Sequence, residues 1–315
     1  MEASALPVAS KRRDVLKKIR ENLDLYLFVL PGIVITFIFH YIPLYGIQIA
    51  FRNYSARKGF WGSPWVGFEH FQRFFDSAYF WDLIWNTLAL SLYSLIAGFP
   101  IPIILALMLN AFKHKRYRKV IQTVTYAPNF ISTVVMCGII LLFLSPRVGI
   151  VNHLIGLLGF EPVNFMAYQS MWRHIYVWTG IWQGMGWSSV IYFAALSGVS
   201  PEYYEAAIVD GATKLQRIWH IDIPFIIPTA VILLILSCGG ILSVGFEKAY
   251  LLQNQLNTGV SEIISTYVYK VGLQGSGGGD MSFSTAIGLF NSVINFILLF
   301  SVNGISRRLS QNSLW

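Results

Sequence analysis

The sequence predicts an all-α membrane protein with about six transmembrane helices, and three observations lead to this prediction. Of the 315 residues, 55% are hydrophobic and only 12% are charged, and the mean hydropathy is +0.56. Soluble domains carry about 25% charged residues, so this chain has too few to cover a solvated surface. The apolar residues also fall in long blocks, and basic residues gather at the block ends.

A backbone in lipid must satisfy its own hydrogen bonds, so each apolar block is expected to be a helix. The predicted spans cover residues 25–51, 83–112, 120–145, 172–196, 223–245 and 283–305. They form a single transmembrane domain, residues 25–305, between an N-terminal tail, 1–24, and a C-terminal tail, 306–315.

The N-terminal tail is basic and has one apolar helical face, which predicts an interfacial helix, with a frayed solvated tail as the alternative. That face consists of Val15, Leu16, Ile19 and Leu23. The apolar run that follows, from Leu25 to about Phe51, is too long for the core of a secretory signal peptide. The first span is therefore expected to be retained.

Prolines mark two of the later spans. Pro100 and Pro102 lie in the second span, Pro224 and Pro228 lie at the start of the fifth, and all four are expected to bend or begin helices. Tryptophans near predicted span ends are typical of an aromatic belt at the membrane interface. These are Trp61, Trp65, Trp81, Trp85 and Trp172.

The connection after the fourth span, residues 200–222, predicts two short helices on one membrane face. Ser200 can cap a helix that starts at Pro201, and Glu202 suits the positive end of its dipole. Gly211 can adopt the left-handed conformation that ends this helix, and an apolar second helix follows it. The pair is a candidate contact for another protein, and an interfacial connector without a partner is the alternative.

Lysine and arginine counts predict the orientation, because cytoplasmic loops are enriched in them. Six lie in the N-terminal tail, five in 113–119, two in 214–217 and two in the C-terminal tail, and the other eight are spread over longer connections. Both termini and residues 200–222 are therefore expected in the cytoplasm. Loops 52–82, 146–171 and 246–282 are expected outside.

Several function classes are disfavoured. The predicted spans carry almost no ionisable side chains, with His40 the nearest candidate, so coupling to an ion gradient is not expected. The chain lacks the Gly-x-x-x-x-Gly-Lys-Ser/Thr phosphate loop and the common hydrolase motifs, so it is not expected to be an enzyme. Its basic residues suit lipid headgroups rather than nucleic acid, and Cys137 and Cys238 are expected to be buried thiols. An ion-coupled carrier and a non-transporting scaffold or enzyme remain the competing hypotheses.

The same connection resembles the EAA motif of ABC importer permeases. The resemblance rests on Glu205-Ala206-Ala207, then Asp210-Gly211-Ala212, then Ile221-x-Ile223-Pro224, with Asp222 where a neutral residue is commoner. Further stretches resemble the LplB-type polysaccharide permeases, which belong to the type I carbohydrate importers. They are residues 125–132, 149–152, 288–291 and 303–315.

This resemblance implies a multi-pass permease subunit in a bacterial inner membrane. It implies that Glu205, Ala206, Ala207, Asp210, Gly211 and Ala212 form a coupling helix that inserts into an ATPase. The implied partners are a second permease subunit that makes a heterodimer, two ATPase subunits and an extracytoplasmic binding protein. ATP and magnesium would be held by the ATPases, and this chain would have no cofactor or metal of its own. An oligosaccharide is the implied cargo, and acidic alginate- or pectin-like fragments are named because several family members take uronic acids.

Sugars stack on aromatic rings and bond to neutral amides, so polar and aromatic residues within the spans are candidates for the substrate pathway. The candidates are Trp178, Trp182, Gln183, Trp187, Asn291 and Asn295. Polar side chains in spanning helices usually face the bundle interior. The alternative is structural, with the amides bonding neighbouring helices and the tryptophans filling a subunit interface.

Overall fold

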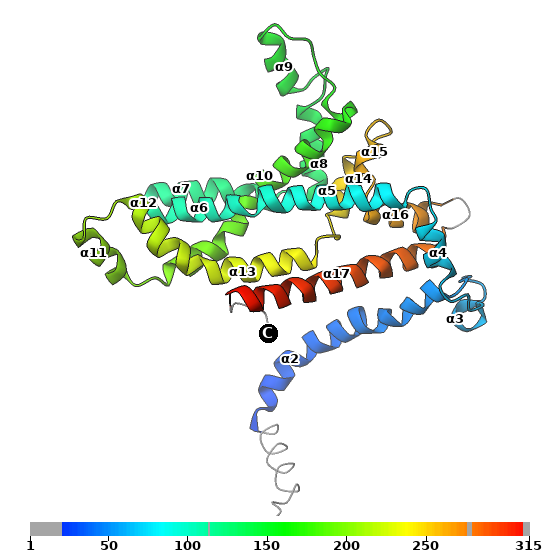
Figure 1. The fold of residues 1–315 in the computed structure, drawn as a ribbon. Helices are drawn as coiled ribbons and strands as arrows, with labels where there is room; N and C mark the ends of the chain where they lie inside the picture. Colours follow the sequence, from blue (N-terminus) through cyan, green and yellow to red (C-terminus); the bar gives the residue numbers. More distant parts are fainter. Residues whose placement is uncertain (1–20, 113, 276–278, 311–315) are drawn as a thin grey trace, which may run out of the picture.

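The computed structural model describes residues 21–112, 114–275 and 279–310, and these residues are almost entirely helical. The long helices form a bundle with short helices at both ends (Figure 1). In the described part of the chain, four continuous helices are long and apolar enough to cross a membrane, and a bent pair is a fifth candidate. The all-α membrane class predicted from the sequence is confirmed, but the count of six spans is not.

The first predicted span is a continuous helix, Leu23–Phe51, built of three segments. They are α2 (Leu23–Thr36), the π-helical η1 (Phe37–Tyr41) and the 3-10 segment η2 (Ile42–Phe51). No residue of α2 is buried, and α2 diverges from the bundle while η2 packs on α17 (Figure 1). Most of the predicted interfacial tail helix lies outside the described residues.

The second predicted span consists of α5 (Phe80–Gly98) and α6 (Pro100–Ala111), which together run for 32 residues. Pro100 is the first residue of α6. The amide at this position has no partner within α6, so proline is tolerated there. Two short helices, α3 (Gly59–Gly62) and α4 (Glu69–Phe75), precede this span.

The third predicted span, 120–145, differs from the single helix expected there. α7 (Lys115–Tyr126) continues into the 3-10 turn η3 (Ala127–Phe130), and α8 (Thr133–Phe143) then leaves with a bend of 99°. Ile131 is extended, and the Ser132 side chain caps α8 by accepting from the Val135 amide at 3.4 Å. Because Pro128 has no amide proton and Ser132 starts a new helix, the chain turns here instead of running straight.

The segment after α8 leaves the bundle before the fourth span begins. α9 (Ile150–Leu157) projects away from the bundle (Figure 1), and η4 (Phe165–Ala167) leads back to it. The fourth predicted span is α10 (Gln169–Ser197), a single helix of 29 residues. It is long enough to span, but tryptophan, glutamine, glycine and serine interrupt its aliphatic residues, so no stretch of it is as apolar as those in the four continuous candidates.

The remaining chain contains the fifth and sixth predicted spans. α11 (Pro201–Val209) is followed by a continuous helix, Lys214–Gly239, made of α12 (Lys214–Arg217), the π-helical η5 (Ile218–Asp222) and α13 (Ile223–Gly239). The segment between α13 and α17 contains α14 (Phe246–Leu251), α15 (Thr258–Ser261), α16 (Ile264–Tyr269) and η6 (Lys270–Gln274). α17 (Met281–Ser310) is the sixth predicted span and includes part of the predicted C-terminal tail.

Three apolar clusters hold the bundle together. One surrounds Trp172 where α8, α10 and α14 meet, another surrounds Phe74 between α4, α5, α16 and α17, and the third joins α6, α10 and α13 around Tyr192. Many large apolar side chains outside these clusters are exposed. Such a surface suits lipid or another membrane subunit, not water.

Candidate functional site

α11 stands at one end of the bundle, away from the long helices (Figure 1). The Ser200 hydroxyl accepts from the Glu202 amide at 3.4 Å, and Pro201 is the first helical residue, as the sequence predicts. The helix closes at Gly211, which has a φ of +75°, with the Ala212 amide donating to the Ala207 carbonyl at 2.8 Å. Caps at both ends let a helix of only 9 residues keep its shape while it protrudes.

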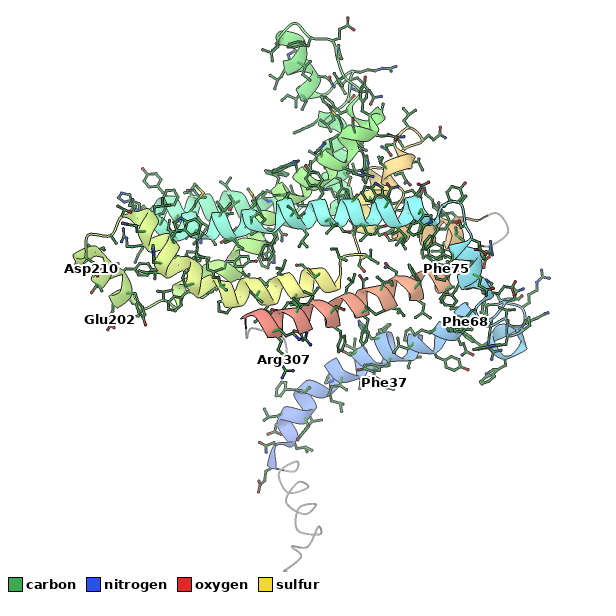
Figure 2. All side chains as sticks on the ribbon, viewed as in Figure 1. Phe37, Phe68, Phe75, Glu202, Asp210 and Arg307 are labelled. Atoms are coloured by element: carbon green, nitrogen blue, oxygen red, sulfur yellow. The ribbon has the colours of Figure 1, made fainter. Side chains whose placement is uncertain are left out.

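The six residues predicted to contact an ATPase fall on two sides of α11 and its terminal turn. Glu205, Ala206, Asp210 and Gly211 are exposed, whereas Ala207 and Ala212 are half-buried. Figure 2 shows Glu202 and Asp210 on the protruding end, far from Phe68 and Phe75 at the opposite end of the bundle. This end of the molecule thus offers a small, partly acidic helical surface.

A polar cluster holds α11 to the ends of α6 and η5. The Tyr204 hydroxyl donates to Asp222 Oδ1 at 2.6 Å, and Asn110 Nδ2 at the end of α6 donates to the same oxygen at 3.2 Å. Asp222 is buried, at 3% exposure. Burial and then the bond to Asp222 raise the pKa of Tyr204 to about 12, so its phenol keeps the donated proton at neutral pH. We call Tyr204, Asp222 and Asn110 the α11 anchor.

The expectation of a second separate short helix after Gly211 is corrected. α12 starts with a capping box in which the Thr213 side chain accepts from the Gln216 amide and Gln216 bonds back to Thr213. It does not end after one turn, because η5 carries the helix without a break into α13. Leu215, Ile218 and Trp219 therefore belong to the first turns of the fifth span.

The predicted substrate-pathway amides bond to irregular backbone. Gln183 Nε2 donates to the Ile131 carbonyl at 2.9 Å, at the bend between α7 and α8. Asn295 accepts from the Leu242 amide at 3.0 Å and donates to Ser243 Oγ at 2.9 Å. These bonds hold neighbouring elements in place, and a pathway role for both residues stays a prediction. Asn291 Oδ1 is buried without a hydrogen-bond partner in the described part of the chain.

The three candidate tryptophans are about half exposed on α10. Trp178 Nε1 donates to the Tyr93 hydroxyl at 2.9 Å, and the Trp187 ring lies edge-on to Phe130 with 6.0 Å between ring centroids. Trp182 shares the exposed side with Trp178. None of the three lines the cavity described next.

A cavity of about 410 Å³ lies between α5, α6, α10 and the turn from α13 to α14. Its walls are glycines, serines and aliphatic side chains, with Lys248 as the one charged group among the described residues that line it. Sequence analysis missed Lys248 because it follows the fifth apolar block and was counted with an outer loop. It also missed the anchoring role of Asp222. For Lys248, the available signal was a single lysine within the run Gly245-Phe246-Glu247-Lys248-Ala249-Tyr250-Leu251.

Comparison with known proteins assigns this architecture. The family described as binding-protein-dependent transport system inner membrane component matches residues 98–311. Protein LplB of Bacillus subtilis (strain 168) is 42% identical over 291 residues, covering 92% of this chain and 91% of that protein. The polygalacturonan/rhamnogalacturonan transport system permease protein YteP of the same strain is 40% identical over 305 residues, covering 97% and 94%.

Solved structures agree with the sequence relatives. A chain from the crystal structure of a bacterial ABC transporter involved in the import of the acidic polysaccharide alginate aligns with a TM-score of 0.85 and 41% identity, over 94% of this chain and 99% of that chain. A second structure of a bacterial alginate ABC transporter, in complex with an alginate pentasaccharide-bound periplasmic protein, gives the same TM-score at 40% identity. The protein is thus a membrane-embedded permease component of an ABC transport system, and it belongs to the binding-protein-dependent transport system inner membrane component family.

Proposed function

We propose that this permease forms half of the membrane channel of an importer for acidic oligosaccharides. Among the relatives, YteP is named for polygalacturonan and rhamnogalacturonan transport, and the aligned solved structures come from bacterial alginate importers. Alginate and galacturonan are both chains of uronic acids, so the shared chemistry of the cargo is a carboxylate on each repeating sugar. The alginate importer binds a loaded periplasmic protein, and we extend this arrangement to the present chain.

The observation that carries the coupling part of the proposal is the exposed, capped helix α11. Its motif residues Glu205, Ala206, Asp210 and Gly211 are accessible, while the α11 anchor ties the helix to α6 and η5. A partner that binds α11 can therefore move the spanning helices that contain α6 and η5 together with it. We assign that partner to an ATPase that supplies ATP and magnesium chemistry, with two ATPase subunits and a different second permease in the complete importer.

The proposed orientation places α11 and both termini in the cytoplasm. The basic residues of 113–119 and 214–217 and the arginines at the end of α17 support it. Loops 52–82, 146–171 and 246–282 would then face the binding protein on the outside. The exposed tryptophans of α10 and Asn291 remain candidates for contact with cargo or with the second permease.

Uptake by the purified importer in proteoliposomes tests this function. The complete complex, with its binding protein, is supplied with ATP inside and with alginate pentasaccharide, pentagalacturonate or neutral maltopentaose outside. We expect uptake of at least one acidic pentasaccharide, together with ATP hydrolysis that rises when the loaded binding protein is added. Uptake of maltopentaose alone would refute the acidic cargo, and uptake without any ATPase subunit would refute the coupling.

A further inference from the structure

The cavity beside Lys248 is partly open and is lined by helices that have small side chains where they face it. Gly98, Gly180, Gly184 and Gly240 leave room in its walls, and serines from α5, α10 and α13 supply hydroxyls. The Ser94 hydroxyl oxygen is buried and has no hydrogen-bond partner in the described ranges. A volume of about 410 Å³ with unfilled hydrogen-bonding capacity is large enough for a sugar ring.

Lys248 is held with its ammonium against the cavity wall. The side chain comes from α14 and is buried, at 8% exposure. Nζ donates to the Tyr176 carbonyl at 2.8 Å and to Thr179 Oγ1 at 2.9 Å, and it lies 4.9 Å from the centre of the Tyr176 ring. A Cβ on Gly180 would lie 3.1 Å from Nζ, so a side chain there would crowd the ammonium and the glycine leaves it room.

The charge of Lys248 is not neutralised within the described part of the chain. The ion pairs between described residues are Arg73 with Asp280 and Lys270 with Glu262, and neither involves Lys248. The neighbouring Glu247 is exposed and does not line the cavity. A buried ammonium with only neutral partners is costly, and it has a third proton left to donate. An incoming carboxylate would supply both the missing bond and the missing charge.

We propose that Lys248 is a carboxylate-binding residue in the transport path, which contacts one uronate of the cargo as it passes between α5, α10 and α13. The proposal rests on the proposed function, because it presumes an acidic oligosaccharide. Lys248 then contributes to selecting acidic over neutral sugars inside the membrane, after the binding protein has released its cargo. A single cation suits transit, since one contact can form and break as successive sugars move.

Neutral substitutions at Lys248 test the role. Lys248→Gln keeps a donor for the Tyr176 carbonyl but removes the charge, and Lys248→Met keeps the length without a donor. Lys119→Gln is the matched control, because Lys119 is an exposed lysine on α7 that does not line the cavity. Each variant is assembled into the full importer. Uptake of alginate pentasaccharide and pentagalacturonate is measured together with complex yield and with ATPase stimulation by the loaded binding protein.

We expect both Lys248 variants to lose uptake by roughly 10–100-fold, as removal of one charge-assisted hydrogen bond predicts, while complex yield and stimulated ATPase stay near wild type. The control should match the wild type in all readouts. Unchanged uptake would overturn the proposal, and so would a parallel loss of assembly or ATPase, which would make Lys248 a structural anchor. If the wild-type importer itself takes up neither acid, the proposed function fails instead.

Discussion

Asn152, at 4% exposure, uses both ends of its side-chain amide to fasten the segment between α8 and α10. Nδ2 donates to the carbonyls of Leu144, Ser145 and Val163, and Oδ1 accepts from the Val163 amide at 2.7 Å. Nearby, a Cβ on Gly149 would clash with the Phe143 carbonyl oxygen and would lie 2.5 Å from the Ser145 carbonyl oxygen. The Gly149-Ile150-Val151-Asn152 stretch that resembles the permease family thus shapes the loop between α8 and α10.

Replacing Asn152 with alanine should destabilise this loop, because four backbone groups lose their partner. With about 1 kcal/mol for each bond and partial replacement by water, we expect a loss of roughly 2–4 kcal/mol. Thermal unfolding of the purified protein measures the change. His153→Ala is the control, since His153 is exposed next to it. Equal melting temperatures for the two variants would show that the four bonds are dispensable.

Tyr204→Phe tests the α11 anchor with the loss of a single oxygen. Without the hydroxyl, Asp222 keeps only the bond from Asn110, and α11 loses its polar tie to η5. We expect uptake to fall about 5- to 20-fold, in line with one strong hydrogen bond, while ATP hydrolysis persists. Tyr203→Phe is the matched control, because its ring packs on Phe225 and that contact needs no hydroxyl. Equal uptake by both variants would remove the anchor from the coupling argument.

At the scale of elements, the local signals of α11 were readable from the sequence, and those of the third span were not. Ser200, Pro201 and Gly211 each act at the position that capping rules assign to them. Pro128 could either kink a helix or end it. The 99° bend depends on how α8 packs against α10 and α14, which are distant in sequence. The fusion of α12 with α13 and the placing of Lys248 in a cavity likewise depend on contacts distant in sequence.

Gly211→Val should weaken coupling through backbone strain alone. No atom lies within 4 Å of a Cβ built there, so the cost comes from the φ of +75°, about 1–2 kcal/mol for a side chain. Gly211→Asn is the control, because asparagine tolerates this conformation. In the assembled importer we expect the valine variant to transport fewer sugars for each ATP hydrolysed. Retention of full transport by valine would contradict the role given to this turn.

Gly186 tests the crossing of α10 over α7. A Cβ at Gly186 would lie 2.0 Å from the Thr125 carbonyl oxygen, so alanine forces the two helices apart. We expect Gly186→Ala to destabilise the purified protein by about 2 kcal/mol or more, as overpacking does. Gly138→Ala is the control, since nothing lies within 4 Å of its Cβ. Thermal unfolding of both variants makes the comparison, and equal stability would mean that the crossing adjusts freely.

At the scale of the whole molecule, the bundle has two unlike ends. α11 stands at one end, and α4 and the segments around Phe68 and Phe75 stand at the other (Figure 2). The end at α4 is held by ion pairs such as Arg73 with Asp280, 2.6 Å apart, whereas α11 is held to the bundle by the hydrogen bonds of Tyr204 with Asp222 and Asn110. α2, with no buried residue, leaves an apolar side for lipid or for the second permease.

Site-directed labelling tests the orientation of these ends. In a background without Cys137 and Cys238, a cysteine at Lys58 should react with a membrane-impermeant maleimide in intact cells. A cysteine at Glu202 should react only after the membrane is opened. Both positions are exposed in the structure, so a difference in labelling reports sidedness and not burial. The reverse pattern would place α11 outside and exclude its contact with a cytoplasmic ATPase.

The continuous helix Lys214–Gly239 runs from the α11 end of the bundle to the wall of the cavity. With a rise of 1.5 Å for each residue, its 26 residues form a lever about 39 Å long. One tip of this lever lies beside α11, and the other reaches Ser237 and Gly240 in the wall of the cavity. A tilt of about 5° around the end beside α11 would shift the far tip by about 3 Å, so a movement of α11 would reach the cavity wall through one helix.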